Sequence, residues 1–185
     1  MLSFTTSSEK DLPGIIELQQ QNLRQNLTAN EIQSQGFVTV SHSLEDLQKM
    51  AVHENNIVMK DGEKIAGYLL AMTKHSKSEI PVLVPLFESF EKINYKNKPV
   101  SHFNYLVVGQ VCIAKEYRGK GFLDQCYAAY KNHFKLKYDF AITEIATSNQ
   151  RSINAHKRIG FTEIYRYTGS TNTEWSVVIW DWKAN

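Results

Sequence analysis

The sequence has 185 residues, of which 42% are hydrophobic and 22% are charged, and its formal net charge is +2. This composition is ordinary for a folded globular protein and is sufficient for a full hydrophobic core. The charge is too small to indicate a nucleic-acid or membrane partner, and no apolar run approaches the length that crosses a bilayer. We therefore expect one domain over residues 1–185, with neither of these partners.

The cysteines and histidines give no sign of a disulfide or a metal site. Cys112 falls in a predicted strand and Cys126 on the apolar side of a predicted helix, so we expect buried reduced thiols rather than a disulfide or a nucleophile. The histidines lie singly, without the spacing of metal ligands, and we expect no metal. Because the chain starts without the pattern of a signal peptide, we expect a cytoplasmic location.

The first quarter of the chain predicts short elements. Residues 2–6 alternate as a strand, and we expect a helix from about Pro13, a residue that is favoured in a first helical turn. Residues 28–42 are less regular and include an extended loop at Gly36–Val38. A short helix is expected over residues 44–53, preceded by Ser43.

The next part contains the clearest hairpin. Asp61-Gly62 between two apolar runs predicts a hairpin over residues 57–71, because this pair favours the turn that matches the twist of paired strands. Apolar residues recur on one face of residues 81–95, which predicts a helix. A polar turn around Pro99 follows over residues 96–102.

The junction after residue 113 predicts an anion site. Residues 105–113 are rich in β-branched and aromatic residues and predict a buried strand, and helical spacing of apolar residues begins after Gly121. Gly119 and Gly121 allow backbone N–H groups to point outward at the start of that helix, where the dipole is positive. With Arg118 and Lys120 beside them, they predict a phosphate or pyrophosphate site. The alternative is a plain strand-to-helix turn with solvated basic residues.

The last part predicts a strand over residues 140–147, a helix over 149–159 that Gly160 ends, and strands over 161–167 and 175–182. Together the elements predict an α/β fold with a mixed, mostly antiparallel central sheet flanked by helices.

Two motifs identify a family. The glycine run is not a nucleoside-triphosphate P-loop, because the pattern Gly-x-x-x-x-Gly-Lys-Ser/Thr is absent. It is not a dinucleotide fingerprint either, because no third glycine follows Gly119 and Gly121. Arg118-Gly119-Lys120-Gly121-Phe122-Leu123 resembles the acetyl-CoA signature of the GCN5-related N-acetyltransferase (GNAT) superfamily, with Leu123 where the family usually has Gly or Ala. The stretch after residue 148 resembles the second CoA-binding motif of that family, with the matching positions Asn149, Ser152, His156, Gly160 and Phe161.

This resemblance implies a GNAT-like fold in which acetyl-CoA lies between two splayed strands, here residues 105–113 and 140–147. It implies that backbone groups of one strand pair with the pantetheine arm, that the glycine loop holds the pyrophosphate, and that the second motif contacts the cofactor. The implied cofactor-binding residues are Val111, Ile113, Arg118, Gly119, Lys120, Gly121, Phe122, Leu123, Asn149, Ser152 and His156.

The catalytic groups are less defined. His156 stands where the family often has a Tyr that protonates the CoA thiolate, and an imidazole with a pKa of about 6.5 is able to do the same. Its alternatives are a packing role for His156 and a water as the acid. Gln110 stands nearest to the base of many relatives and cannot act as one. Glu116 is expected at the surface, and Glu144 is a candidate base or an exposed strand-edge residue. We expect direct attack by the amine with no catalytic base.

The resemblance implies acetyl transfer from acetyl-CoA to a primary amine on a small molecule, a peptide or a protein. The acceptor side is expected to be aromatic, with candidates Phe37, Phe87, Phe90, Tyr95, Tyr105, Tyr167 and Trp175, each of which is also explained as a core residue. The alternatives are a non-catalytic acyl-CoA sensor with this fold, another acyl donor such as succinyl-CoA, and an unrelated phosphate-binding domain. A homodimer through the C-terminal strands is left open.

Overall fold

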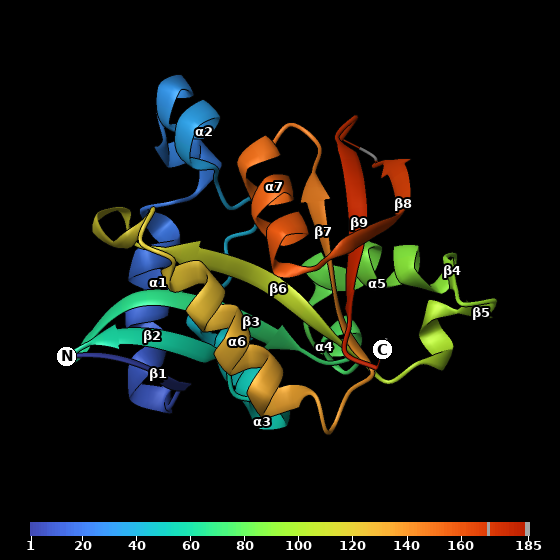
Figure 1. Cartoon of the computed structure of the whole chain (residues 1–185), viewed down its shortest axis with the longest axis horizontal. Coiled ribbons are helices and arrows are strands. Elements are labelled where there is room, and N and C mark those ends of the chain that lie inside the picture. Colours follow the sequence, from blue (N-terminus) through green and yellow to red (C-terminus); the bar gives the residue numbers. More distant parts are fainter. Residues whose placement is uncertain (170, 184–185) are drawn as a thin grey trace.

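A seven-stranded sheet crosses the protein in the order β1-β2-β3-β6-β7-β9-β8 (Figure 1). The computed structural model describes residues 1–169 and 171–183. The strands of the sheet are β1 (Leu2–Thr6), β2 (Ile57–Asp61), β3 (Lys64–Met72), β6 (Tyr105–Ile113), β7 (Phe140–Ala146), β8 (Thr162–Thr168) and β9 (Glu174–Asp181). A separate hairpin consists of β4 (Asn94–Tyr95) and β5 (Lys98–Pro99).

Helices cover both faces of this sheet. They are α1 (Leu12–Gln20), α2 (Ala29–Gln35), α3 (Leu44–His53), α4 (Ser76–Glu79), α5 (Val84–Glu91), α6 (Phe122–Phe134) and α7 (Gln150–Ile159). One core joins side chains of α1, α3 and α5 to one face of the sheet, and the second joins α6 to the opposite face. In Figure 1, α6 and α7 lie in front of the strands. Among the described residues, no helix is long and apolar enough to span a bilayer.

The sheet opens between its two central strands. β6 and β7 run parallel and pair only where Tyr105–Val107 lie opposite Phe140–Ile142. One further link follows, from the hydroxyl of Thr143 to the carbonyl of Val108 at 2.8 Å. Beyond it the two strands continue without pairing, whereas every other pair of neighbours in the sheet is antiparallel. The predicted mostly antiparallel sheet with splayed central strands is therefore confirmed.

Most predicted elements are present within one or two residues of their expected bounds, but two stretches differ. The single helix predicted over 81–95 was wrong, because Pro81–Leu83 form a 3-10 turn, α5 ends at Glu91 and a hairpin follows. Proline at both 81 and 85 lacks the N–H that a continuous helix needs, so a new helix starts at Val84. Residues 96 and 97 have φ of 48° and 61°, the backbone of a tight hairpin turn.

The second difference is α2, which forms within the stretch predicted to be irregular. Thr28 caps it: Oγ1 of Thr28 accepts from the backbone N–H of Glu31 at 3.3 Å, and the Glu31 carboxylate accepts from the backbone N–H of Thr28 at 3.1 Å. This reciprocal pair satisfies donors at the helix start and stabilises a helix of only seven residues.

Candidate active site

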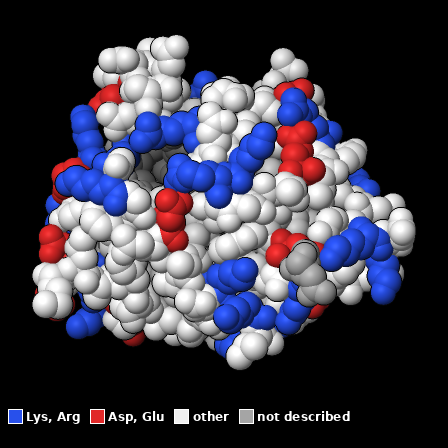
Figure 2. Space-filling model, viewed as in Figure 1, with Lys and Arg blue, Asp and Glu red and all other residues white. Residues whose placement is uncertain are grey.

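A cavity of about 760 Å³ occupies the opening between β6 and β7. Its walls are the end of β6, the loop before α6, the first turn of α6, one side of α7, and residues 33–38, which end α2 and begin its connection to α3. Figure 2 shows the corresponding hollow with Lys and Arg side chains gathered around it and an acidic group at one side. Arg118, Arg151 and Arg158 are the basic residues in its lining, and Asp124 is the acidic one.

The glycine loop has the geometry of an anion site. Gly119 and Gly121 have φ of 73° and 77°, a left-handed conformation that glycine adopts without strain. Gly121 precedes the first residue of α6, and no side chain caps this helix of 13 residues. A Cβ atom at either glycine meets nothing within 4 Å, so open space lies in front of the loop. Uncapped N–H groups with free space before them fit a pyrophosphate.

The two basic residues of the loop are placed differently. Arg118 lines the cavity, and its guanidinium is bound within the chain: Nε donates to the Ile113 carbonyl at 2.8 Å, and the two terminal nitrogens donate to the side-chain oxygens of Gln35 and Asn22. Lys120 lies outside the cavity lining, and its Nζ donates to the Glu116 carbonyl at 2.8 Å. The positive charge of the site therefore comes from Arg118 and from the arginines of α7.

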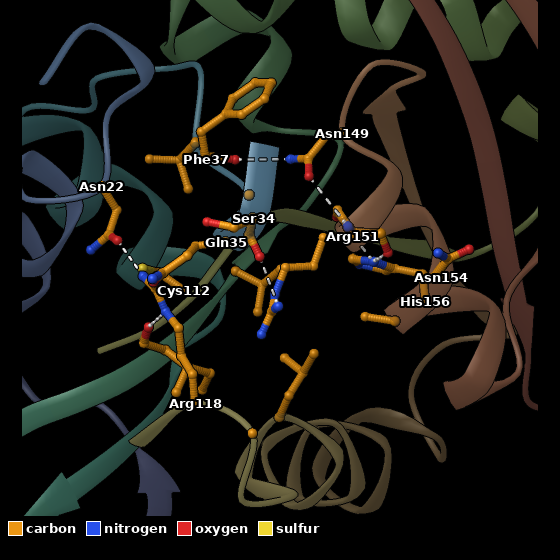
Figure 3. Close-up of a pocket in the computed structure, with 18 of the residues that line it drawn as sticks. Asn22, Ser34, Gln35, Phe37, Cys112, Arg118, Asn149, Arg151, Asn154 and His156 are labelled. Carbon is orange, nitrogen blue, oxygen red and sulfur yellow. Dashed lines mark hydrogen bonds between the residues drawn. The ribbon is translucent and has the colours of Figure 1, made fainter. Parts of the chain in front are cut away.

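The second motif shapes the opposite wall. Oδ1 of Asn149 caps α7 by accepting from the backbone N–H of Ser152 at 3.3 Å, and its Nδ2 donates to the Phe37 carbonyl at 3.1 Å (Figure 3). Arg151 donates to the Ser34 carbonyl at 2.9 Å. At the rim, Arg158 on α7 forms an ion pair of 2.8 Å with Asp124 on α6. Asn149 and Arg151 thus each direct one side-chain donor at the backbone of residues 33–38.

His156 is buried, with 3% of its surface exposed, and both ring nitrogens are engaged. Nδ1 lies 2.8 Å from the Ser152 carbonyl and Nε2 lies 2.6 Å from the Tyr127 hydroxyl. Because a carbonyl only accepts, Nδ1 carries the proton and Nε2 accepts from the Tyr127 hydroxyl. Burial lowers the pKa of His156 to about 4, so the ring is neutral near pH 7.

Of the three groups considered for the base, Glu144 alone has the environment of a functional carboxyl. It follows Thr143, the last residue that links β7 to β6, and by strand alternation it shares the face of Ile142. The Glu144 carboxyl is partly buried and accepts from the Tyr167 hydroxyl. Burial raises its pKa, although the hydrogen bond from Tyr167 acts in the opposite direction.

The other two groups have structural partners. The Gln110 amide oxygen accepts from the Tyr68 hydroxyl and its nitrogen donates to the Val40 carbonyl at 2.8 Å. Glu116 pairs with Lys64 at 2.6 Å, with both side chains more than half exposed. A surface position for Glu116 is thus observed, while the partly buried position of Glu144 differs from that of an exposed edge residue because β9 pairs along the whole of β7.

The cavity brings the two motifs together, although they lie some thirty residues apart. The implied cofactor-binding residues that line it are Val111, Ile113, Arg118, Gly119, Gly121, Phe122, Leu123, Asn149, Ser152 and His156. The sequence reasoning did not expect residues 33–38, Asn22, Asp124, Arg151 and Arg158 at this cavity, although it named Phe37 for the acceptor side. Of these, only Gly36 carried a local signal, since its φ of 75° favours glycine. In the part of the chain that the structure describes, no group of three His, Cys, Asp or Glu side chains is arranged to hold a metal.

The predicted aromatic acceptor side is mostly core. Phe87 and Phe90 are 2% and 0% exposed, and Tyr105 stacks on Phe140. Tyr167, Tyr95 and Trp175 keep part of their surface exposed, and Phe37 lines the cavity between β6 and β7. The explanation of an ordinary core therefore holds for Phe87, Phe90 and Tyr105.

Comparisons with known proteins agree with this geometry. The profile of the acetyltransferase (GNAT) family matches residues 26–161. Similar solved structures include the ribosomal-protein-S18-alanine N-acetyltransferase from Escherichia coli, with a TM-score of 0.66, 10% identity, and coverage of 100% of this chain and 96% of that one. A GNAT-family acetyltransferase from Streptococcus agalactiae has a TM-score of 0.67, 11% identity and the same coverage.

A third similar structure is a chimeric spermidine N-acetyltransferase made from Vibrio cholerae SpeG and hSSAT. Its TM-score is 0.60 at 16% identity, with coverage of 98% of this chain and 95% of that one. No curated protein matches the sequence. At these identities the structural matches establish the fold, and the family match covers more than half of the chain.

Proposed function

Because the chain belongs to the acetyltransferase (GNAT) family, we propose that it transfers the acetyl group of acetyl-CoA to a primary amine by direct attack. The observation that carries the proposal is the cavity between the unpaired ends of β6 and β7, which ends at an uncapped helix N-terminus behind two left-handed glycines. Such a site suits a long ligand with an anionic pyrophosphate at one end and a reactive group at the other.

The residues that would hold acetyl-CoA follow from the cavity walls. The backbone N–H groups of residues 119–123 would bind the pyrophosphate, and the unpaired edge of β6 at Val111 and Ile113 would pair with the pantetheine arm. Ser152 and His156 would border the donor from α7. In the reaction the amine nitrogen forms a bond to the thioester carbon, the carbon–sulfur bond breaks, and the sulfur leaves as a thiolate that takes up a proton.

Glu144 is the group that we assign to the amine side. A primary amine is mostly an ammonium ion near pH 7 and must lose a proton before it attacks. Glu144 has no ion-pair partner among the described residues, and its position beside the last link between β6 and β7 would let it bind the ammonium ion and accept the proton. This assignment departs from the expectation that no base takes part.

For the thiolate, we propose that a water supplies the proton and that His156 has a packing role. A neutral imidazole whose free nitrogen accepts from Tyr127 is poorly suited to donate. The same observation favours the second candidate function, a non-catalytic acyl-CoA sensor with a GNAT fold. An acyl donor other than acetyl-CoA, a cytoplasmic location and a homodimer stay predictions.

The acceptor is an amine on a small molecule or on a peptide or protein. The names of the similar structures include a ribosomal-protein alanine and spermidine as acceptors, so this fold accommodates both classes. The discriminating experiment is calorimetric titration with acetyl-CoA, CoA and ATP, followed by thiol release against a panel of polyamines, amino acids and N-terminal peptides. Binding of CoA but not ATP with thiol release from one amine class is expected. Binding without release from any amine indicates the sensor, and no preference for CoA refutes both.

A further inference from the structure

Arg118 is a member of the glycine loop, yet its guanidinium is engaged by three oxygen atoms of the protein itself. Its partners are the carbonyl of Ile113 at the end of β6, the amide of Gln35 at the end of α2 and the amide of Asn22 after α1. These partners come from three different parts of the chain. None is a carboxylate, so the charge of Arg118 is not neutralised by an ion pair among the described residues.

The partners of Arg118 lead to residues 33–38, which we name the bridging segment. From the opposite side of the cavity, Asn149 donates to the Phe37 carbonyl at 3.1 Å and Arg151 donates to the Ser34 carbonyl at 2.9 Å. Figure 3 shows Ser34, Gln35 and Phe37 between Arg118 with Asn22 on one side and Asn149 with Arg151 on the other. The bridging segment therefore joins the two walls of the opening between β6 and β7.

The segment then continues to the face of the sheet that carries Glu144. The Val38 N–H donates to the Asn22 carbonyl at 3.0 Å, and the Val40 carbonyl accepts from Gln110 beside the bulge of β6. Gln110 also bonds to Tyr68, whose ring belongs to the core shared by α1, α3 and α5. Residues 33–40 thus lead from the cavity lining to Gln110, which bonds to Tyr68 in the core on the face that carries Glu144.

We propose that Arg118 is a positioning residue that holds the bridging segment in place and does not bind a phosphate of the donor. The N–H groups of a guanidinium point in fixed directions in one plane. Three acceptors on separate elements therefore fix the orientation of the Arg118 side chain, which contact with a single phosphate oxygen does not need. Three of the five N–H donors of the guanidinium are occupied by these acceptors, so turning the fork toward a phosphate would break the bonds to Gln35 and Asn22 and free the segment. The pyrophosphate is then held by the backbone of residues 119–123. The positioning role of Arg118 rests on these contacts alone, and only its relation to CoA rests on the proposed function.

The test separates charge from geometry at one position. Arg118→Lys keeps the charge but loses the fork, and Arg118→Gln loses both. Hydrogen–deuterium exchange of the peptide that covers residues 33–38 and calorimetric titration with CoA are measured for each. We expect exchange to rise at least about tenfold in both variants, and the CoA Kd to rise less than about threefold in Arg118→Lys and less than about fivefold in Arg118→Gln, because only long-range attraction is lost.

Lys120→Gln is the matched control, since Lys120 is a neighbouring cation whose hydrogen bond to Glu116 stays within its own loop. It should leave exchange of the bridging segment unchanged. Asn22→Ala and Gln35→Ala remove single acceptors of Arg118 without changing the motif, and they keep the test decisive if an Arg118 variant does not fold. Both should raise exchange of the segment.

Either of two results overturns the positioning role of Arg118. One is unchanged exchange of the bridging segment in the two Arg118 variants, Asn22→Ala and Gln35→Ala. The other is a CoA Kd that rises more than tenfold in Arg118→Gln and is preserved in Arg118→Lys, as expected of a residue that binds phosphate. If the unmodified protein does not bind CoA, the proposed function fails, and the exchange measurement still tests the positioning role of Arg118. With an amine identified by the thiol-release panel, Arg118→Lys should raise the KM of the amine more than it lowers kcat.

Discussion

Gly121→Asp tests the donor site directly. Gly121 has φ of 77°, and a Cβ at this position meets no atom within 4 Å, so the free protein accommodates the side chain. The left-handed backbone strains any other residue by about 1 kcal/mol, which lowers the free energy of unfolding slightly. A carboxylate placed some 4–6 Å from the pyrophosphate repels it by roughly 3–4 kcal/mol at an effective dielectric constant of 20. The Kd for acetyl-CoA should therefore rise by about a hundredfold to a thousandfold.

Gly62→Asp is the matched control for this substitution. Gly62 also has a positive φ, 60°, with nothing within 4 Å of an added Cβ, but it lies in the turn between β2 and β3, outside the cavity lining. Both variants should lose a similar free energy of unfolding in urea melts, and calorimetry should show weaker acetyl-CoA binding only for Gly121→Asp. Equal and unchanged affinities in the two variants would refute the assignment of the glycine loop to the pyrophosphate.

Three further predictions concern the titratable groups. Glu144→Gln should lower kcat at least about tenfold and remove the rise of kcat/KM that occurs as the pH passes the raised pKa of this carboxyl. Glu116→Gln, at the surface, should change neither. An unaltered pH profile in Glu144→Gln argues against a base. His156→Phe should lower the free energy of unfolding by about 1–3 kcal/mol, because the Tyr127 hydroxyl loses its partner. It should change kcat by less than about threefold. A drop of kcat by about a hundredfold at unchanged CoA affinity would instead support the acid role. Burial lowers the pKa values of His42 and His156 to about 4, so between about pH 6.5 and 4 the unfolded chain binds protons that the folded chain does not. The melting temperature should therefore fall as the pH is lowered through this window. A melting temperature that does not change there would contradict buried neutral rings.

What the sequence revealed well are features encoded over short stretches. The β6–loop–α6 unit combines a β-branched run, two glycines and a helical apolar pattern within thirty residues, and its elements match the prediction. The capping box of α2 is also local, with Thr28 and Glu31 three residues apart, and applying that rule to residues 28–31 finds the helix.

Contacts between distant segments account for what the sequence did not reveal. The guanidinium of Arg118 meets Gln35 and Asn22 across 83 and 96 residues of sequence, so nothing in the motif indicates that its donors are occupied. The pKa of His156 depends on burial and on its bond to Tyr127 on another helix. For the same reason the sequence left Glu144 open as a candidate base or an exposed strand-edge residue, because its partial burial depends on β9 pairing beside β7.

The charge distribution explains how a protein with a net charge of only +2 could attract two oppositely charged substrates. Arg118, Arg151 and Arg158 surround the donor cavity, and Arg118 contributes its charge although its hydrogen bonds are made within the chain. On the sheet face shared with Ile142, Glu144 offers a carboxyl with no cationic partner among the described residues. In the proposed reaction an anionic donor and a cationic acceptor would thus be favoured on different sides of one opening and would meet where β6 and β7 separate. Raising the ionic strength should weaken donor binding through the arginines more than it affects chemistry at Glu144, because exposed charges are screened more strongly than partly buried ones.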